Sequence, residues 1–147
     1  MTLQRVIPKK IGELLVESGK ITRKNLEEAL EKQKKDKRPL GEILVSMSAV
    51  TEEEIAYCLS IQYGIPFLQL QFYELDEKVM ALFPKEMIEE GMFVPLDQMG
   101  KILTVAIANP LDEETLAKIE KQTGMKVQYF VCTMSEINQT IAKYLKK

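Results

Sequence analysis

The sequence predicts an α+β protein in which a helical repeat precedes a small sheet with helices. The stretch Lys10–Gln33 recurs as Pro39–Gln62, and the offset is the same at both ends, 39 − 10 = 62 − 33 = 29. Apolar residues follow helical spacing up to Gly64, and two β-type apolar runs come later, at Phe93–Leu96 and Ile102–Ala108. We therefore expect a duplicated helical-hairpin subdomain over residues 1–63 and an α+β subdomain over residues 64–147.

The repeat is visible in identical residues as well as in its apolar skeleton. In the order of the chain, Gly12, Glu13, Leu15, Val16, Thr22, Leu30 and Gln33 recur as Gly41, Glu42, Leu44, Val45, Thr51, Leu59 and Gln62. Other pairs exchange one branched aliphatic side chain for another, such as Leu26 for Ile55. Internal self-similarity at a fixed period indicates that a structural unit has been duplicated.

Each copy predicts two short helices joined by a tight turn. The first copy predicts a helix from Ile11 to Ser18-Gly19 and a second helix that Thr22 caps. In the second copy the equivalent turn is Ser48-Ala49, and Thr51 with Glu54 forms a capping box. The second helix of this copy is expected to bury Ile55, Ala56, Leu59 and Ile61.

The pattern changes after Gly64-Ile65-Pro66. A short extended segment at Phe67–Leu70 and two small helices, opened by Asp76 and Pro84, are expected before the two β-type runs. Beyond these runs the expected features are a helix that starts at Asn109-Pro110 and buries Leu111, Leu116, Ala117 and Ile119, a strand at Val127–Val131, and a helix capped by Ser135 that buries Ile137, Ile141 and Ala142. This order predicts helices on one face of a mostly antiparallel sheet.

Composition excludes several classes of function. The formal net charge of −2 argues against general DNA binding, and no apolar run is long enough to span a bilayer. There is no histidine, which removes the commonest general base and a common zinc ligand. The two cysteines, Cys58 and Cys132, each lie in an apolar pattern, where a reduced and packed thiol is expected.

No catalytic or metal-binding constellation stands out. The GxxxxGK[ST], GxGxxG and GxSxG patterns are all absent. The acidic runs Glu52-Glu53-Glu54 and Asp112-Glu113-Glu114 fall in the first turns of expected helices, where carboxylates offset the macrodipole. We therefore expect a non-enzyme with no required cofactor.

A duplicated unit tends to pack with approximate two-fold symmetry, which suits a two-fold symmetric ligand. Gly12 and Gly41 start short helices, where free N–H groups and the missing Cβ would let a phosphate or a base approach the backbone. Gln33 and Gln62 end the longer helices and either hydrogen-bond a base edge or face solvent. The basic cluster Lys32–Arg38 is either a solvated connector or a cationic rim beside a ligand.

The doubled stretch resembles the MshEN domain, the N-terminal module of type II secretion and type IV pilus ATPases. The family pattern RLGxxLxxxGxxxxxxLxxxLxxQ occurs twice here, around the five-residue spacer Lys34–Arg38. The resemblance extends to most of the chain through four further stretches: GIPFLQL, LFPKEM, ILTVAIANPLD and SEINQTIAKYL. It implies a regulatory, non-catalytic module that binds cyclic di-GMP through both motifs. The expected ligand-binding residues are Lys10, Ile11, Gly12, Leu15, Gly19, Leu26, Leu30, Gln33, Arg38, Leu40, Gly41, Leu44, Ile55, Leu59 and Gln62.

The resemblance also implies partners and a location. The expected partners are an ATPase motor domain and an inner-membrane platform protein, without direct membrane insertion. The expected location is cytoplasmic, either free or peripheral at the inner membrane.

The chain departs from the family pattern at positions expected to contact the ligand. The leading arginine is Lys10 in one copy and Pro39 in the other, Arg38 comes one residue early, and Ser48 replaces the second glycine. Arginine pairs with guanine O6 and N7 as a fork, which neither lysine nor proline can do. The alternative function is therefore an adaptor that docks on an inner-membrane secretion-system partner, with nucleotide binding weakened or lost.

Overall fold

The computed structural model describes residues 11–108 and 113–145, and it divides the chain into two compact units. The first unit ends at Ile65, and we call it the helical unit; the second begins at Pro66, and we call it the α+β unit. The expected helix start at Asn109-Pro110, together with Leu111, lies outside the described residues. The chain is α+β, as the sequence predicts.

The helical unit consists of two αα-hairpins, one from each copy of the repeat. The first copy forms α1 (Ile11–Glu17) and α2 (Arg23–Lys35), and the second forms α3 (Leu40–Ser46) and α4 (Glu52–Tyr63). Thr22 caps α2 through Asn25, and Thr51 caps α4 through Glu54; both capping boxes are complete. The interior is almost entirely aliphatic, with Leu15, Leu26, Ile43, Leu44, Ile55 and Leu59 all buried.

The expected apolar face of α4 is wrong at one position. Ile55, Ala56 and Leu59 are buried, but Ile61 is exposed. The inward stripe of α4 continues instead to Gln62, at i+7 from Ile55. Ile61 is one position earlier and therefore faces away from the stripe.

The α+β unit begins with the short 3₁₀ helix η2 (Leu70–Phe72), α5 (Glu77–Met80) and α6 (Lys85–Gly91). The strands β1 (Phe93–Met99) and β2 (Ile102–Ile107) form an antiparallel hairpin, and α7 (Glu113–Thr123) leads to β3 (Lys126–Val131). The chain continues into α8 (Met134–Leu145). Phe67, expected in an extended segment, makes a single parallel bridge with Val131 at the outer edge of β3.

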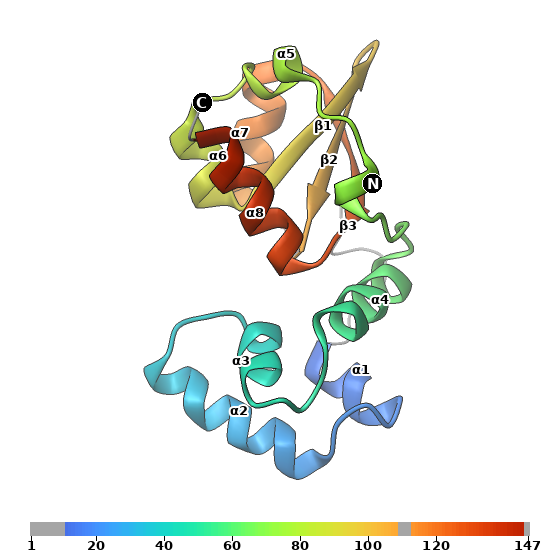
Figure 1. Ribbon diagram of the computed structural model, residues 1–147, viewed down its shortest axis with the longest axis vertical. Helices are drawn as coiled ribbons and strands as arrows, with labels where there is room; N and C mark the ends of the chain where they lie inside the picture. Colours follow the sequence, from blue (N-terminus) through green and yellow to red (C-terminus); the bar gives the residue numbers. More distant parts are fainter. Residues whose placement is uncertain (1–10, 109–112, 146–147) are drawn as a thin grey trace. The chain divides into compact units, whose positions relative to one another are not determined.

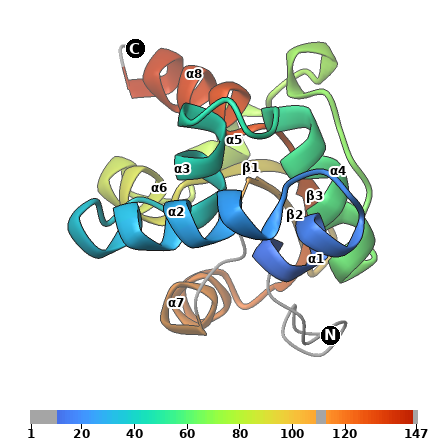
Figure 2. The same ribbon diagram turned by 90° about the horizontal axis from the view of Figure 1, so that it is seen from below.

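The expectation of a mostly antiparallel sheet is wrong. The strand order is β1-β2-β3, and β2 pairs with β3 in parallel. A helical crossover such as α7 returns the chain to the same end of the sheet, and therefore makes the next strand parallel. Helices also lie on both faces, α8 on one and α7 on the other (Figures 1 and 2). The five consecutive buried residues Leu103–Ile107 of β2 reflect this double cover.

Two further details of the helices differ from expectation. Thr133, not Ser135, caps α8: its hydroxyl accepts a hydrogen bond from the Glu136 N–H and donates one to the Glu136 carboxylate, both at 3.2 Å. Thr133 and Glu136 have the three-residue spacing of a capping box, which places the cap two residues earlier. Ala117 and Ala142, expected to be buried, are exposed on α7 and α8.

The two hairpin turns of the helical unit share an unusual backbone conformation. Gly19, after α1, has a φ of +76°, and Ser48, its counterpart after α3, has a φ of +60°. The left-handed region is favourable for glycine and costs other residues about 1 kcal/mol. The duplicated fold therefore retains the turn after losing the glycine.

We expect Ser48→Gly to raise the free energy of unfolding by about 0.5–1 kcal/mol, because glycine relieves the left-handed strain. Gly19→Ser is the matched variant in the other copy and is expected to lower it by a similar amount. Urea unfolding followed by circular dichroism measures both changes. If Ser48→Gly instead lowers the free energy of unfolding, the serine side chain stabilises the fold by more than its left-handed backbone destabilises it.

Candidate functional site

The two copies of the repeat pack against each other in the helical unit. The first helix of each copy packs mainly against the second helix of the other copy: α1 against α4, and α3 against α2 (Figures 1 and 2). Such reciprocal contacts are those of an approximate two-fold arrangement. The expected motif residues are therefore distributed over both copies in related positions.

Most of the expected ligand-binding residues build the interior of the helical unit. These buried residues are Gly12, Leu15, Leu26, Gly41, Leu44, Ile55, Leu59 and Gln62. Their role in the structure is to hold the hairpins together.

The two motif glycines show this packing role directly. A Cβ atom on Gly12 would lie 2.6 Å from Leu26 Cδ1 and 3.1 Å from Leu40 Cδ2. A Cβ atom on Gly41 would lie 3.3 Å from Ile55 Cγ2. The expectation that these glycines open the backbone to a ligand is therefore not met on their Cβ side, where aliphatic side chains already fill the space.

The remaining expected residues that the structure describes are accessible, and all of these but Gly19 lie near the connector between the copies. Ile11, Gln33 and Leu40 are half-buried, and Leu30 and Arg38 are exposed. Gly19 is exposed at the other end of α1, and Lys10 lies outside the described residues. Leu40 lies beside Gly12, and Gln33 Nε2 donates a hydrogen bond to the Arg38 carbonyl at 3.2 Å. These contacts bring the start of α1, the end of α2 and the start of α3 together.

The connector holds its arginine in an ion pair. Arg38 Nε lies 2.8 Å and Nη2 2.7 Å from Asp36 Oδ2, and the Arg38 N–H donates to Oδ1. The side-chain hydrogen bond lowers the pKa of Asp36 and raises that of Arg38. The two side chains are 47% and 41% exposed, so water screens the pair and it is weak and exchangeable. Lys34, Lys35 and Lys37 are exposed around it.

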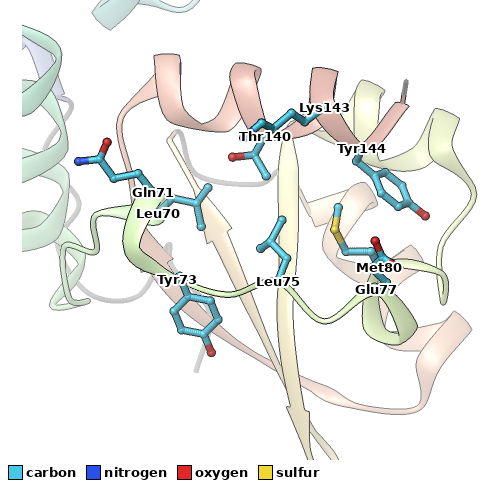
Figure 3. A pocket seen from close by; sticks show the side chains of 9 residues that line it. All are labelled: Leu70, Gln71, Tyr73, Leu75, Glu77, Met80, Thr140, Lys143 and Tyr144. Carbon is cyan, nitrogen blue, oxygen red and sulfur yellow. The ribbon is translucent and has the colours of Figure 1, made fainter. Parts of the chain in front are cut away.

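The α+β unit contains a hollow of about 300 Å³ that sequence reasoning missed. It lies between α8 and the segment running from η2 to α5 (Figure 3). Leu70, Leu75 and Met80 point towards α8, and Thr140 and Tyr144 face them (Figure 3). Gln71, Tyr73, Glu77 and Lys143 complete the lining. No motif marks these residues in the sequence, because three separate elements contribute them.

Two contacts fix the segment that forms one wall of this hollow. The Tyr73 hydroxyl hydrogen-bonds the Asp97 carboxylate on β1, which raises the pKa of Tyr73 to about 12. The Gln71 N–H donates to Glu136 Oε2 at 3.2 Å. These two hydrogen bonds therefore fix the wall of the hollow that contains Gln71 and Tyr73. Phe72, between these two residues in the chain, is 78% exposed.

Other kinds of site are not found where the structure describes the chain. Within residues 11–108 and 113–145, no group of three or more cysteine, aspartate or glutamate residues could hold a metal ion. Cys58 and Cys132 are free thiols, and Cys132 is buried. None of the described helices is both long and apolar enough to cross a membrane.

Comparison with known proteins identifies one family and several relatives that match nearly the whole chain. The family model of the MshEN domain matches residues 63–147. The chain is 33% identical over 146 residues to the type IV pilus assembly ATPase PilB of Thermus thermophilus, covering 98% of this chain and 16% of that protein. It is 30% identical over 135 residues to PilB of Myxococcus xanthus, covering 92% and 24%. The chain thus spans less than a quarter of these curated relatives.

Solved structures share the fold. A structure of MshE with cdg superposes with a TM-score of 0.79 at 24% identity, covering 92% of this chain and 99% of the other. A structure of the N-terminal domain of XpsE superposes with a TM-score of 0.73 at 19% identity, covering 97% and 96%. The matched family segment contains the α+β unit, whereas both structures also cover the tandem repeat in the helical unit.

Proposed function

Because this chain belongs to the MshEN domain family, we propose that it is a non-catalytic regulatory module of the type II secretion and type IV pilus ATPase type that binds cyclic di-GMP on the helical unit. The observation that carries this proposal is the tandem motif, folded as two reciprocally packed hairpins. The proposal is supported by the fold that this chain shares with MshE, whose structure was solved with cdg. We take cdg to mean cyclic di-GMP. In this role the chain acts with an ATPase motor domain on the cytoplasmic side of the inner membrane.

The ligand would bind to the accessible residues around the connector. Leu30, Leu40 and Ile11 offer aliphatic surface for a base, and Arg38 offers a guanidinium fork for the guanine edge. The exposed lysines of the connector lie close enough in the chain to Arg38 to attract the phosphates. The buried motif residues would contribute by fixing the shape of this surface.

Calorimetric titration of the purified chain with cyclic di-GMP tests the proposal. We expect a saturable binding heat and a rise in melting temperature that grows with ligand concentration. The affinity is expected to be roughly ten- to hundred-fold below that of a site with the full arginine pattern, because one fork is replaced. No heat and no thermal shift at high-micromolar ligand, with a folded protein, would overturn it.

Asp36 is expected to compete with the ligand for Arg38. Asp36→Asn should therefore tighten cyclic di-GMP binding about two- to fivefold, because an exposed ion pair no longer has to be broken. Glu31→Gln is the matched control: it removes the same charge from an exposed pair, with Lys34 at 2.8 Å, but leaves Arg38–Asp36 intact. Equal effects of both variants in calorimetry would show that only net charge matters.

A second candidate function is an adaptor that docks on the cytoplasmic domain of an inner-membrane platform protein. The observation that favours it is the hollow of the α+β unit together with Phe72, which is 78% exposed and lies in the chain between the lining residues Gln71 and Tyr73. Large exposed aromatic side chains beside apolar hollows are typical anchors of protein interfaces.

Binding of a purified platform-protein cytoplasmic domain, measured by calorimetry, tests the adaptor function. We expect Phe72→Ala to weaken this binding at least tenfold, as for an interface anchor. Met99→Ala is the control, because Met99 is 75% exposed at the β1–β2 turn, away from the lining of the hollow. Equal affinities of wild type and Phe72→Ala would argue against this docking surface.

A further inference from the structure

We propose that Ser60 of α4 restrains a hinge between the helical unit and the α+β unit. The hinge is the segment of residues 64–68, and the boundary between the two units falls inside it, after Ile65. Each hydrogen bond that carries the inference lies within one unit or within the other. The inference goes beyond the proposed function and requires no nucleotide.

On the side of the helical unit, the backbone of the hinge is held to the last turn of α4. Gly64 ends this helix with a φ of +64°, and its N–H donates to the Ser60 carbonyl. The Ile65 N–H donates to the same carbonyl at 3.1 Å. A bond from the second residue beyond the helix to this carbonyl is typical of a Schellman motif. The last residue of the helical unit therefore belongs to the end of the helix.

On the side of the α+β unit, the chain is held to β3 as soon as it enters. The Pro66 carbonyl accepts a hydrogen bond from the Val131 N–H at 2.9 Å, and the Leu68 N–H donates to the Val131 carbonyl at 2.8 Å. Phe67, between them in the chain, makes its parallel bridge with Val131. Hydrogen-bonded residues therefore lie directly on both sides of the Ile65–Pro66 peptide bond.

The Ser60 side chain holds the peptide plane at the boundary itself. Its hydroxyl donates to the Ile65 carbonyl at 2.5 Å. This carbonyl lies in one plane with the Pro66 nitrogen, so the bond fixes that plane to α4. Gly64 and Pro66 are exposed and Ile65 is half-buried. Hydrogen bonds, more than burial, therefore determine how freely the hinge moves.

The Ser60 hydrogen bond decides how many backbone torsions are free between the two units. While it is present, the held planes on either side of Pro66 are separated by φ and ψ of that residue, and the proline ring fixes φ near about −65°. Only ψ of Pro66 then remains to rotate. When the bond breaks, φ and ψ of Ile65 are released as well, although the following proline restricts ψ to the extended range.

The first copy of the repeat ends its longer helix without this arrangement. The counterparts of Ser60 and Gly64, 29 positions earlier, are Glu31 and Lys35. The residue that follows α2, Asp36, is extended and not left-handed. The restraint is therefore specific to the copy that adjoins the α+β unit. A change in the last turn of α4 that moves the Ser60 hydroxyl would release the hinge.

The inference is tested by ¹⁵N relaxation of the whole chain without ligand, which gives an order parameter for each amide and a rotational correlation time for each unit. In the wild type we expect order parameters of about 0.85 at the amides of Ile65, Phe67 and Leu68. Ser60→Ala should lower the correlation times of both units by about a fifth or more, because each unit then turns partly on its own. Ser46→Ala is the matched control and should leave both times unchanged, since it removes a similar bond, 2.7 Å from Ser46 Oγ to the Ile43 carbonyl, within α3.

Pro66→Gly is a second variant that leaves the Ser60 hydrogen bond in place and frees φ at the boundary. It should lower both correlation times in the same direction as Ser60→Ala. Order parameters below about 0.6 in the wild-type hinge would overturn the inference, because the segment would then be a flexible linker. Wild-type correlation times in the folded Ser60→Ala or Pro66→Gly protein, or an equal decrease in Ser46→Ala, would overturn it too. Since no nucleotide is present, none of these outcomes decides the proposed function.

Discussion

Leu15→Ala and Leu44→Ala are each expected to lower the free energy of unfolding of the helical unit by about 2–5 kcal/mol. The two leucines are counterparts in the repeat, and both are completely buried. Each substitution removes an isobutyl group from a core in which the surrounding helices can relax only partly. A unit of this size has little stability to spare, so we expect much of it to unfold at 37 °C. Urea unfolding at 25 °C measures the loss.

Leu30→Ala separates packing from ligand contact within the same motif. Leu30 is partly in water, so its truncation should change the free energy of unfolding by less than about 1 kcal/mol. It should still weaken cyclic di-GMP binding, because it removes aliphatic surface from the proposed site. A stable Leu15→Ala protein that has lost only its ligand affinity would show instead that the buried leucine contacts the ligand.

The helical part of the fold could be predicted closely from sequence because packing determines it. The repeated aliphatic skeleton fixes which helix faces are buried, and the Thr22 and Thr51 caps fix where α2 and α4 begin. The parallel pairing of β2 and β3 was missed although the helix between them was expected. The spacing of Thr133 and Glu136 is likewise visible in the sequence, although the expected cap is Ser135.

The candidate site was less predictable because a family pattern does not distinguish core from surface. Gly12 and Gly41 were expected to admit a ligand, but Leu26 and Ile55 occupy the space beside them. Leu59 matches Leu30 in sequence yet is buried, because burial depends on the neighbours of each helix and not on the residue itself. The hollow of the α+β unit could not be inferred, since it depends on how distant segments pack.

Alkaline pH is expected to destabilise the α+β unit because two of its buried acids resist ionisation. Burial, reinforced by Glu136, raises the pKa of the Cys132 thiol to about 12 from an ordinary value of 9.0. Burial also raises the pKa of Tyr129 from 10.0 to about 12. Above pH 9 the unfolded chain releases these protons while the folded chain keeps them, so stability falls as the pH rises towards 12.

At pH 10.5 we expect a loss of about 2 kcal/mol from Cys132 and about 1 kcal/mol from Tyr129, relative to pH 7.5. Urea unfolding at the two pH values measures it. Cys132→Ala should be less stable at both pH values, because it leaves a cavity, but its loss between them should shrink by about 2 kcal/mol. Cys58→Ala is the matched control: Cys58 is only half-buried and lies in the helical unit, so the pH dependence should change less. An unchanged pH dependence in Cys132→Ala would show that the thiol ionises freely in the folded protein.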